Sequence, residues 1–278
     1  MITDDKTNTV YISDILQTRY PQLHHSLWTM LREENVLLLE LKNTKDIWCC
    51  DYMPVQVSDD EFVMFNYDPD YLYGEEYVLL ITKQDDVIAP LSLNITKSNL
   101  VIDGGNIVRH ERKVILTDKI FKENPHRTKT EILQELRYFL EAEEIIIIPK
   151  VPYDYTGHAD GMVRFVNANT VLLNDFSKLG ESYFEKLKKS ITGQGLNITL
   201  LPWDGWRQKE LSSDLGDYIN FLHVGDLIIV PEFKEETNEA AKTIIRQCFP
   251  KAKVKGLDCV ELALEGGVLH CCTWNIKS

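Results

Sequence analysis

The sequence predicts an α/β protein that folds as a five-bladed, pseudo-symmetric propeller of repeated hairpin–helix–strand units. Two observations predict this fold class. A hairpin, a helix and a buried strand follow one another in several successive segments of the chain. In addition, polar landmark residues recur at intervals of 52, 57, 57 and 54 residues, which is typical of repeated units that share one core. These landmarks are Asp51, Asp103, Asp160, Asp217 and Cys271.

A closed ring of such units would bring equivalent segments together at a central axis, so the landmarks would meet in one cleft. Chance is the alternative explanation, because hairpin–helix–strand segments often have this length and predicted boundaries carry errors of a few residues. No linker or low-complexity segment interrupts the pattern. We therefore predict a single domain over residues 1–278.

The elements of each unit follow from hydrophobic periodicity and from end signals. The helix at 129–141 is the best marked, because Thr128 and Glu131 have the spacing of a capping box. The expected elements, in chain order, are a helix at 22–34 and a strand at 36–41; hairpin strands at 100–102 and 114–116, the helix at 129–141 and a strand at 145–148; hairpin strands at 162–166 and 171–173, a helix at 181–191 and a strand at 197–201; and hairpin strands at 218–222 and 227–230, a helix at 238–248 and a strand at 253–255.

Composition and charge exclude several classes of protein. The hydrophobic content of 44% allows a sizeable core, and the net charge of −13 argues against a nucleic-acid partner. The chain starts with an acidic segment and contains no apolar run long enough to span a membrane, so we expect a cytoplasmic protein without a membrane partner. The sequence leaves open whether the chain forms a homo-oligomer.

The cysteines indicate free thiols in a reducing compartment. Four of the six form adjacent pairs, Cys49-Cys50 and Cys271-Cys272, and neighbouring cysteines bridge only with severe strain. The spacing typical of structural zinc sites is absent. We expect neither a metal nor a cofactor.

Cys271 ends the segment Gly266-Gly267-Val268-Leu269-His270-Cys271. A free cysteine is more often a small core residue than a nucleophile. The double glycine and the adjacent His270 favour the functional interpretation, in which an imidazolium or a bound cation lowers the pKa of the thiol. Cys272 should point to the opposite face and be structural.

His158 and Asp160 alternate along Gly157-His158-Ala159-Asp160-Gly161, so both face one side of an extended segment. The flanking glycines allow a ligand or backbone to approach closely. A solvated surface turn is the alternative. In the functional interpretation, His158 moves protons and Asp160 binds a cation.

Asp51 follows Trp48 by three positions, and together they suit a planar cation. A buried carboxylate binds a guanidinium through two charge-assisted hydrogen bonds, and an indole stacks on its face. A turn aspartate beside a core tryptophan is the alternative.

Asp103 begins an Asp-Gly pair, which is also a common tight turn. Asn220 is either a core amide or a site residue, and its sequence context does not decide between them.

These segments resemble the agmatine deiminase and bacterial peptidylarginine deiminase family of the guanidine-modifying, or pentein, superfamily. The family motifs are Trp-x-Arg-Asp-x-Gly-Pro, Glu- or Asp-Gly-Gly-Asn, Gly-His-x-Asp, Asn-Phe before Val-Pro-x-Phe, and Gly-Gly-x-x-His-Cys. The matching segments of this chain, from residue 48 to the C-terminus, are Trp48 to Pro54, Asp103-Gly104-Gly105-Asn106, Gly157 to Asp160, Asn220-Phe221 with Val230 to Phe233, and Gly266 to Cys271.

The resemblance implies a five-bladed pentein propeller and a hydrolase that releases ammonia from a guanidino compound through a covalent thiouronium intermediate. The implied catalytic residues are Cys271 as nucleophile, His158 as general acid and base, and Asp51 and Asp160 as guanidinium ligands. The implied substrate-binding set is Trp48, Asp51, Asp103, Tyr155, Asp160 and Asn220. The chain departs from the motifs at Cys50, Met53 and Asp103, where typical agmatine deiminases carry arginine, glycine and glutamate.

Three alternatives to deimination of a small guanidine stay open: action on free or peptidyl arginine, amidino transfer to an amine, and a non-catalytic binding role. We expect agmatine or a similar small cation as substrate, because residues 55–76 contain no lysine or arginine. Carboxylates near the mouth of the cleft would attract a distal ammonium and repel an α-carboxylate. A solvated loop without influence on the substrate is the alternative for these acids, which are Asp59, Asp60, Glu61, Asp68, Asp70, Glu75 and Glu76.

Overall fold

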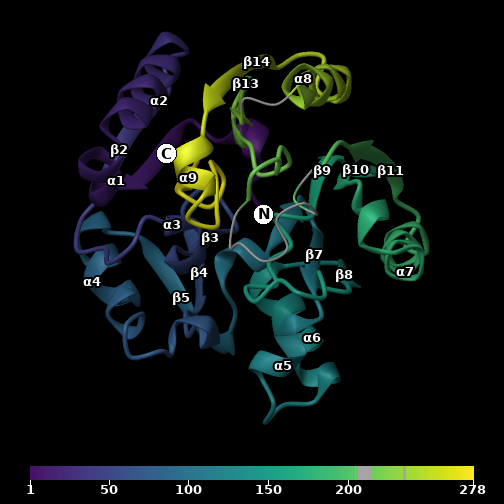
Figure 1. Cartoon of the computed structure of the whole chain (residues 1–278). Coiled ribbons are helices and arrows are strands. Elements are labelled where there is room, and N and C mark those ends of the chain that lie inside the picture. Colours follow the sequence, from purple (N-terminus) through teal and green to yellow (C-terminus); the bar gives the residue numbers. More distant parts are fainter. Residues whose placement is uncertain (204, 206–213, 234–235) are drawn as a thin grey trace.

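The structure, a computed structural model, describes residues 1–203, 205, 214–233 and 236–278. The strands of these residues form five three-stranded sheets around a common centre, and the longer helices α2, α6, α7 and α8 lie on the periphery (Figure 1). The predicted five-bladed α/β propeller is therefore confirmed. The strands are β1 (Thr9–Ser13), β2 (Leu37–Leu41), β3 (Val55–Gln56), β4 (Glu61–Asn66), β5 (Asn94–Val101), β6 (Val108–His110), β7 (Lys113–Thr117), β8 (Glu144–Ile148), β9 (Val163–Asn167), β10 (Thr170–Asn174), β11 (Asn197–Leu201), β12 (Leu222–Val224), β13 (Leu227–Glu232), β14 (Lys253–Asp258) and β15 (Thr273–Ile276).

All five sheets share one topology: an antiparallel pair of strands, then a helical crossover, then a third strand parallel to the second. The antiparallel pair is a hairpin in four sheets, and in the fifth it joins β15 to β1. In the blade of β6, β7 and β8, Val108 lies opposite Ile115 in the hairpin, and Ile115 lies opposite Ile146 in the parallel pair. The sheet orders are β15-β1-β2, β3-β4-β5, β6-β7-β8, β9-β10-β11 and β12-β13-β14.

The helices bury one apolar face each against these sheets. In α6, Ile132, Leu136 and Leu140 recur every four residues and are fully buried, and the predicted capping box of Thr128 and Glu131 is confirmed. The α-helices are α1 (Asp14–Arg19), α2 (Pro21–Glu33), α3 (Cys49–Tyr52), α4 (Gln84–Ile88), α5 (Lys119–Glu123), α6 (Lys129–Leu140), α7 (Glu181–Thr192), α8 (Thr237–Cys248) and α9 (Val260–Ala263). Short 3₁₀ helices are η1 (Asp4–Lys6), η2 (Asp70–Leu72), η3 (Val78–Leu80), η4 (Ala89–Leu91), η5 (Gly104–Asn106) and η6 (Phe176–Leu179).

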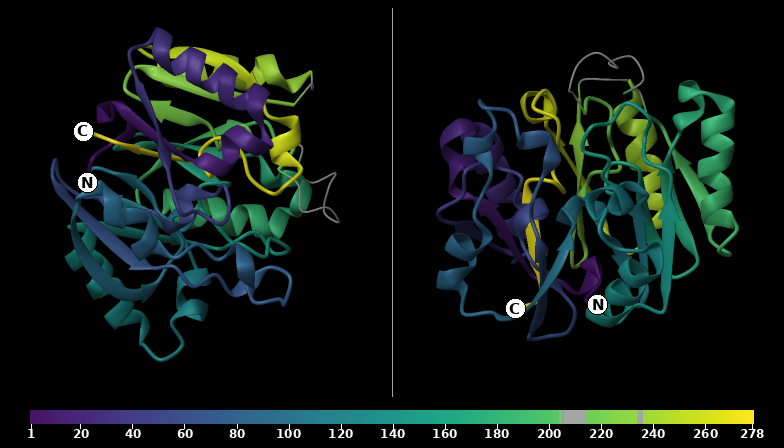
Figure 2. Two further views of the ribbon diagram at one scale, coloured as in Figure 1. Left: turned by 90° about the vertical axis from the view of Figure 1, so that its left-hand side faces the viewer. Right: turned by 90° about the horizontal axis from the view of Figure 1, so that it is seen from below.

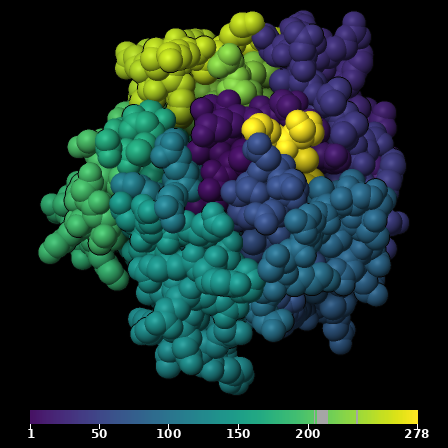
Figure 3. Space-filling view, turned by 180° about the vertical axis from the view of Figure 1, so that it is seen from behind, coloured from purple at the N-terminus to yellow at the C-terminus, as the bar shows by residue number. Residues whose placement is uncertain are grey.

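The first and last strands close the ring. β15 pairs antiparallel with β1, so Thr9 lies opposite Ile276 in a sheet made from both ends of the chain. The two ends lie on the same side of the molecule (Figure 2), and the N-terminal (purple) and C-terminal (yellow) segments lie side by side on the rear face (Figure 3). None of the helices in the described ranges has the length and apolar character that a membrane span requires.

Two predicted strands were wrong, both at the entrance to a blade. Residues 100–102 were assigned to the hairpin of the third blade, but Asn94–Val101 is the parallel third strand of the preceding sheet. That hairpin begins only at Val108, after the Asp103-Gly104-Gly105 segment has formed a 3₁₀ turn. Residues 218–220 likewise form a turn rather than a strand, and β12 starts at Leu222.

These corrections place every landmark at one position in the repeat. Each lies in the short segment that leads into the first strand of a sheet: before β3, β6, β9, β12 and β15, respectively. Because the five sheets are related by the pseudo-symmetry of the ring, these entry segments occur at equivalent places. The ring thus brings together side chains that are about 50 to 60 residues apart in sequence.

Candidate active site

Four of the five landmarks line one pocket of about 870 Å³, namely Asp51, Asp160, Asp217 and Cys271. His158, Trp48, Tyr155 and Asn220 also line it. Asp103 is nearly fully buried and contacts His158. It is not among the described residues that line the pocket. The ring therefore brings all eight residues that the sequence analysis assigned to the site into one region.

His158 lies between two carboxylates. Its Nε2 is 2.9 Å from Oδ2 of Asp103, and its Nδ1 is 3.5 Å from Oδ1 of Asp51. Burial by itself would lower the pKa of His158, but the charges of Asp51 and Asp103 raise that pKa to about 10. His158 is consequently an imidazolium with a proton to give.

Burial raises the pKa of Asp51 to about 7, and the repulsion of Asp103 and Asp160 adds to this effect while His158 opposes it. Burial would also raise the pKa of Asp103, but the hydrogen bond and charge of His158 lower it. Two buried carboxylates thus share one imidazolium. A further cation in the pocket would stabilise the ionised form of Asp51.

Asp160 is bound to a second histidine. Its Oδ2 is 2.8 Å from Nδ1 of His270, and its backbone N–H donates to the carbonyl of Gly105. Burial would raise the pKa of Asp160, but His270, followed by His158 and Arg164, lowers it. The Asp160 side chain is therefore a carboxylate with a fixed orientation at the wall of the pocket.

Asn220 positions the thiol of Cys271. Its Nδ2 donates to Sγ of Cys271 at 3.1 Å, and its Oδ1 accepts from the backbone N–H groups of His270 and Cys271. The amide therefore contacts the Cys271 segment and also lines the pocket. Sγ of Cys271 also lies 3.5 Å from Oδ2 of Asp160.

Burial, with Asp160 and Asp51 nearby, raises the pKa of Cys271 well above its usual value. The resting side chain is therefore a neutral thiol. A positive charge that enters the pocket would offset these carboxylates and favour removal of the proton.

Close packing explains the double glycine after Asp103. A Cβ on Gly105 would lie 2.7 Å from both Oδ1 of Asp51 and Nδ1 of His158, and a Cβ on Gly104 would lie 2.0 Å from the carbonyl oxygen of Cys50. The backbone N–H of Gly105 donates to Oδ1 of Asp51 at 3.0 Å. The two glycines therefore allow the Asp51 and Asp103 segments to approach His158 from both sides.

Aromatic side chains form much of the remaining wall. Tyr155 is half-exposed and lies edge-on to Tyr71, which in turn lies edge-on to the ring of His158. Trp48 packs on Gly267, where a Cβ would lie 2.5 Å from its ring. These rings line the same pocket as the charged groups described above.

The pocket is strongly acidic, although its acids differ from those expected. None of the seven acids of residues 55–76 lines the pocket, and that stretch contributes Tyr67, Tyr71 and Leu72 instead. Arg19 is the one lysine or arginine among the described lining residues, and its Nη2 is held 2.5 Å from Oε1 of Glu265. The carboxylates that line the pocket are Asp46, Asp51, Asp154, Asp160, Asp214, Asp217 and Glu265.

The comparisons agree with this geometry. The sequence pattern of the Porphyromonas-type peptidyl-arginine deiminase family matches residues 2–276. The chain belongs to this family. It is 27% identical over 285 residues to an agmatine deiminase of Pseudomonas aeruginosa (strain LESB58), covering 87% of this chain and 77% of that protein. It is 26% identical over 231 residues to a relative from Marinomonas sp. (strain MWYL1), of which it spans 63% of the length, while 70% of this chain is aligned.

Solved structures show the same fold. An agmatine deiminase of C. jejuni superposes with a TM-score of 0.81 at 18% identity, covering 99% of this chain and 94% of that one. The predicted membership of the deiminase family and the predicted pentein propeller are both confirmed.

For this member of the peptidyl-arginine deiminase family, sequence reasoning missed three residues around the site. His270 was noted only as a neighbour of the thiol, yet it holds Asp160. Asp214 lines the pocket, and its pKa is raised to about 7 by burial, then by Asp154 and Asp160. Lys119 was not considered. The adjacency of His270 to Cys271 was the one available signal, since the partners of Asp214 and Lys119 come from distant segments.

Lys119 supports the far side of His158. Its side chain is only 3% exposed, and Nζ lies 3.3 Å from Asp103, 2.8 Å from Glu123 and 4.8 Å from the centre of the Tyr71 ring. Burial would lower the pKa of Lys119, but Asp103 and Glu123 raise it, so the ammonium persists. Without it, two buried carboxylates would lose their shared cation.

We expect Lys119→Met to lower the free energy of unfolding by about 3 kcal/mol, because removal of one partner from a buried ion pair leaves a charge uncompensated. Urea unfolding measures this change. Lys122→Met is the matched control: Lys122 pairs with Asp70 at 3.1 Å, but its side chain is 76% exposed, so little change is expected. Equal stability of both variants would contradict the structural role of Lys119.

Proposed function

We propose that this chain is a cysteine-dependent hydrolase, working as one domain, that deiminates a small guanidino cation such as agmatine and releases ammonia. One observation carries the proposal. The thiol of Cys271 adjoins Asp160 and Asn220, in a pocket that also holds Asp51 and an imidazolium, His158. A nucleophile, a general acid and two carboxylates for a planar cation are the groups that this reaction requires.

Asp51 and Asp160 bind the guanidinium. Its paired N–H donors match the two oxygens of a carboxylate, and the buried setting strengthens each contact. Trp48, which lines the same pocket, offers an aromatic face to the cation. Binding neutralises carboxylates that otherwise repel one another, so the substrate stabilises the folded protein.

The bound cation activates the nucleophile. Because the pKa of Cys271 is raised by burial and by carboxylates, a guanidinium beside Asp51 and Asp160 offsets the second cause and favours the thiolate. Nδ2 of Asn220 then donates to the negative sulfur. The thiolate forms when substrate is present, which protects the enzyme from reaction with other electrophiles.

The reaction has two halves. The thiol proton of Cys271 goes to solvent, Sγ attacks the central guanidinium carbon as the thiolate, and His158 donates its proton to the departing nitrogen, so ammonia leaves and a covalent thiouronium remains. His158, now neutral, removes a proton from a water molecule. The hydroxide adds to the thiouronium carbon, and the C–S bond breaks to give a ureido product and the regenerated thiol.

The electrostatics of the pocket favour a substrate with a second positive charge. Asp214 and Asp217 line the pocket, and burial raises both pKa values, with the charges of Asp154 and Asp160 adding to the shift of Asp214 and that of Asp214 adding to the shift of Asp217. The guanidinium of Arg19 is neutralised by Glu265. A distal ammonium would therefore find carboxylates, whereas the α-carboxylate of arginine would find no uncompensated cation among the described lining residues.

We expect kcat/KM for agmatine to exceed that for free arginine and for a peptide ending in arginine by at least about 10-fold, or about 1.4 kcal/mol. Release of ammonia measures all three substrates under the same conditions. Preference for a carboxylate-bearing substrate would overturn the choice of agmatine and leave the mechanism intact. A folded protein that releases ammonia from none of the three would refute the proposed hydrolase.

Amidino transfer is the second candidate, because a pocket of about 870 Å³ has room for an amine beside a small guanidine. An amine that attacks the thiouronium in place of water would yield a new guanidine instead of a urea. Product analysis with and without an added primary amine separates the two reactions.

A further inference from the structure

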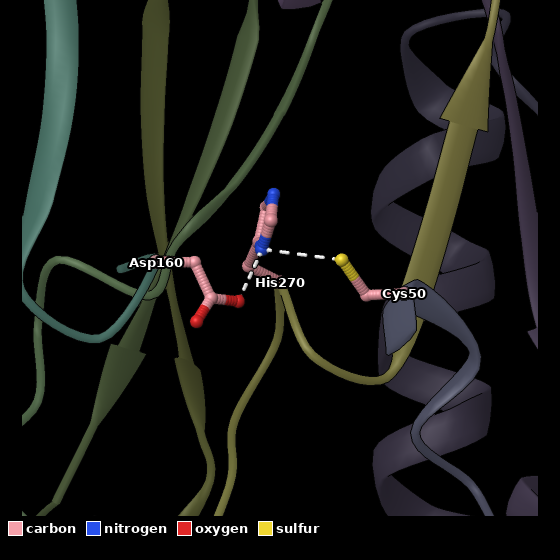
Figure 4. A group of neighbouring side chains, drawn as sticks. All are labelled: Cys50, Asp160 and His270. Atoms are coloured by element: carbon pink, nitrogen blue, oxygen red, sulfur yellow. Dashed lines mark hydrogen bonds and ion pairs between the residues drawn. The ribbon is translucent and has the colours of Figure 1, made fainter. Parts of the chain in front are cut away.

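Three metal-binding side chains converge beside the nucleophile: Cys50, Asp160 and His270 (Figure 4). Nδ1 of His270 lies 2.8 Å from Oδ2 of Asp160 and 3.7 Å from Sγ of Cys50. One donor atom from each residue lies within 4.8 Å of the other two. They come from α3, from the segment before β9 and from the loop before β15, so the ring has assembled them from three blades.

The proposed reaction leaves this group only partly explained. Asp160 binds the guanidinium and His270 orients Asp160, but Cys50 takes part in no step. The Cys50 thiol is nevertheless directed toward His270 rather than into the apolar core (Figure 4). It is also partly exposed, which gives an ion a route to the site.

The donors suit a borderline divalent ion. Tetrahedral zinc takes sulfur at about 2.3 Å and nitrogen or oxygen at about 2.0–2.2 Å, which corresponds to distances of about 3.3–3.6 Å between ligand atoms. Two of the three distances between ligand atoms, 2.8 and 3.7 Å, bracket that range and the third is no more than 4.8 Å, so side-chain movements would complete the site. A thiolate, an imidazole and a carboxylate are all common zinc ligands, and three protein ligands leave the fourth position for water.

We propose that Cys50, Asp160 and His270 form a binding site for zinc or a chemically similar divalent ion, and that the bound ion inhibits the enzyme. Binding breaks the S–H bond of Cys50, and the proton goes to solvent while sulfur coordinates the ion. Nδ1 of His270 coordinates as the lone-pair nitrogen, with its proton on Nε2. Oδ2 of Asp160 exchanges its hydrogen bond to His270 for a bond to the ion.

Inhibition follows from the shared carboxylate. Asp160 cannot hold the ion and present the same oxygen to a guanidinium, and the ion adds positive charge where the substrate cation would bind. Metal and substrate should therefore compete. This inhibitory consequence rests on the proposed function, whereas metal binding itself does not.

Cobalt(II) is a suitable probe because its spectrum reports the ligands. In the chelator-treated wild-type protein, we expect one equivalent of Co²⁺ to bind with a sulfur-to-cobalt charge-transfer band and the visible bands of tetrahedral coordination. Zn²⁺ should displace it. Absence of the sulfur band in the wild-type protein would overturn the proposal without reference to any variant.

Substitutions of single cysteines test which residue provides the sulfur ligand. Cys50→Ser should lose the band and bind Zn²⁺ at least about 10- to 100-fold more weakly, since even outer-shell changes cost that much. Cys248→Ser is the matched control, because Cys248 ends α8, outside the cluster, and the variant should keep the band. Cys271→Ser should also keep it. Retention of the band in Cys50→Ser, or its loss in Cys271→Ser alone, would overturn the assignment.

The proposed inhibition is tested by measuring ammonia release in the presence of Zn²⁺. The ion should raise the apparent KM for agmatine in the wild-type protein and in Cys248→Ser, and much less in Cys50→Ser. Unchanged kinetics at Zn²⁺ concentrations that saturate the cobalt-detected site would overturn inhibition. The two proposals remain separable, because the cobalt spectra need no turnover and ammonia release needs no metal.

Discussion

Cys271→Ala should reduce kcat by at least about 10⁴-fold and leave the protein folded, because loss of a nucleophile removes the covalent route entirely. The thiol faces the pocket, so its replacement by a methyl group creates little cavity. Asp51 and Asp160 remain, so agmatine should still bind and raise the melting temperature of the variant. Ammonia release and thermal unfolding with and without agmatine measure these two effects.

Cys272→Ala is the control for this substitution. Cys272 is fully buried in the core, with Sγ 3.5 Å from the carbonyl oxygen of Leu269. The variant should keep most of its activity and lose about 1 kcal/mol of stability. The opposite result, with an active Cys271→Ala and an inactive but folded Cys272→Ala, would mean that the wrong sulfur has been assigned.

His158→Asn should lower kcat by about 10²- to 10⁴-fold, the usual contribution of a general acid–base. The substitution also removes the imidazolium that Asp51 and Asp103 share, so Asp51 loses its cation and Asp103 keeps only Lys119. We therefore expect a lower melting temperature, partly restored by agmatine. Steady-state kinetics and a thermal shift assay on the same preparation provide both values.

His110→Asn is the matched control, because His110 lies on β6, stacks on Phe165 and does not line the pocket as described. Its kcat should stay within a few-fold of the wild-type value. Full activity in His158→Asn would exclude His158 as the group that protonates ammonia. Equal losses in the two variants would indicate a general effect of substitution on the fold.

The repeat interval and the periodic helices were sufficient to predict the propeller. The blade entrances were harder to locate. Residues 100–102 form an apolar run that suits a hairpin strand as well as the parallel strand that it proved to be. The crossover between β4 and β5 did not mark the end of its blade in the sequence, because residues 70–91 form several short helices instead of one long periodic helix.

Site residues were predictable where the chemistry lies within one segment. Cys271, His158 and Asp160 each stand in a local motif that limits their interpretation. The role of His270 depends on a carboxylate 110 positions earlier, and that of Lys119 on Asp103 and Glu123 together. The acids of residues 55–76 were predicted to act on the substrate, but none of them lines the pocket. Their position in the sequence after Asp51 did not indicate their position in the structure.

Closure of the ring by β1 and β15 has a consequence for the newly made protein. Cys271 lies two positions before β15, which is synthesised after the other fourteen described strands. A nascent chain can therefore build the carboxylate and imidazole side of the pocket long before it has a nucleophile. The sulfur of Cys271 joins Asp160 and Asn220 only when β15 pairs with β1. A chain that stops short of β15 would therefore carry the carboxylates and the imidazole of the pocket without the proposed nucleophile.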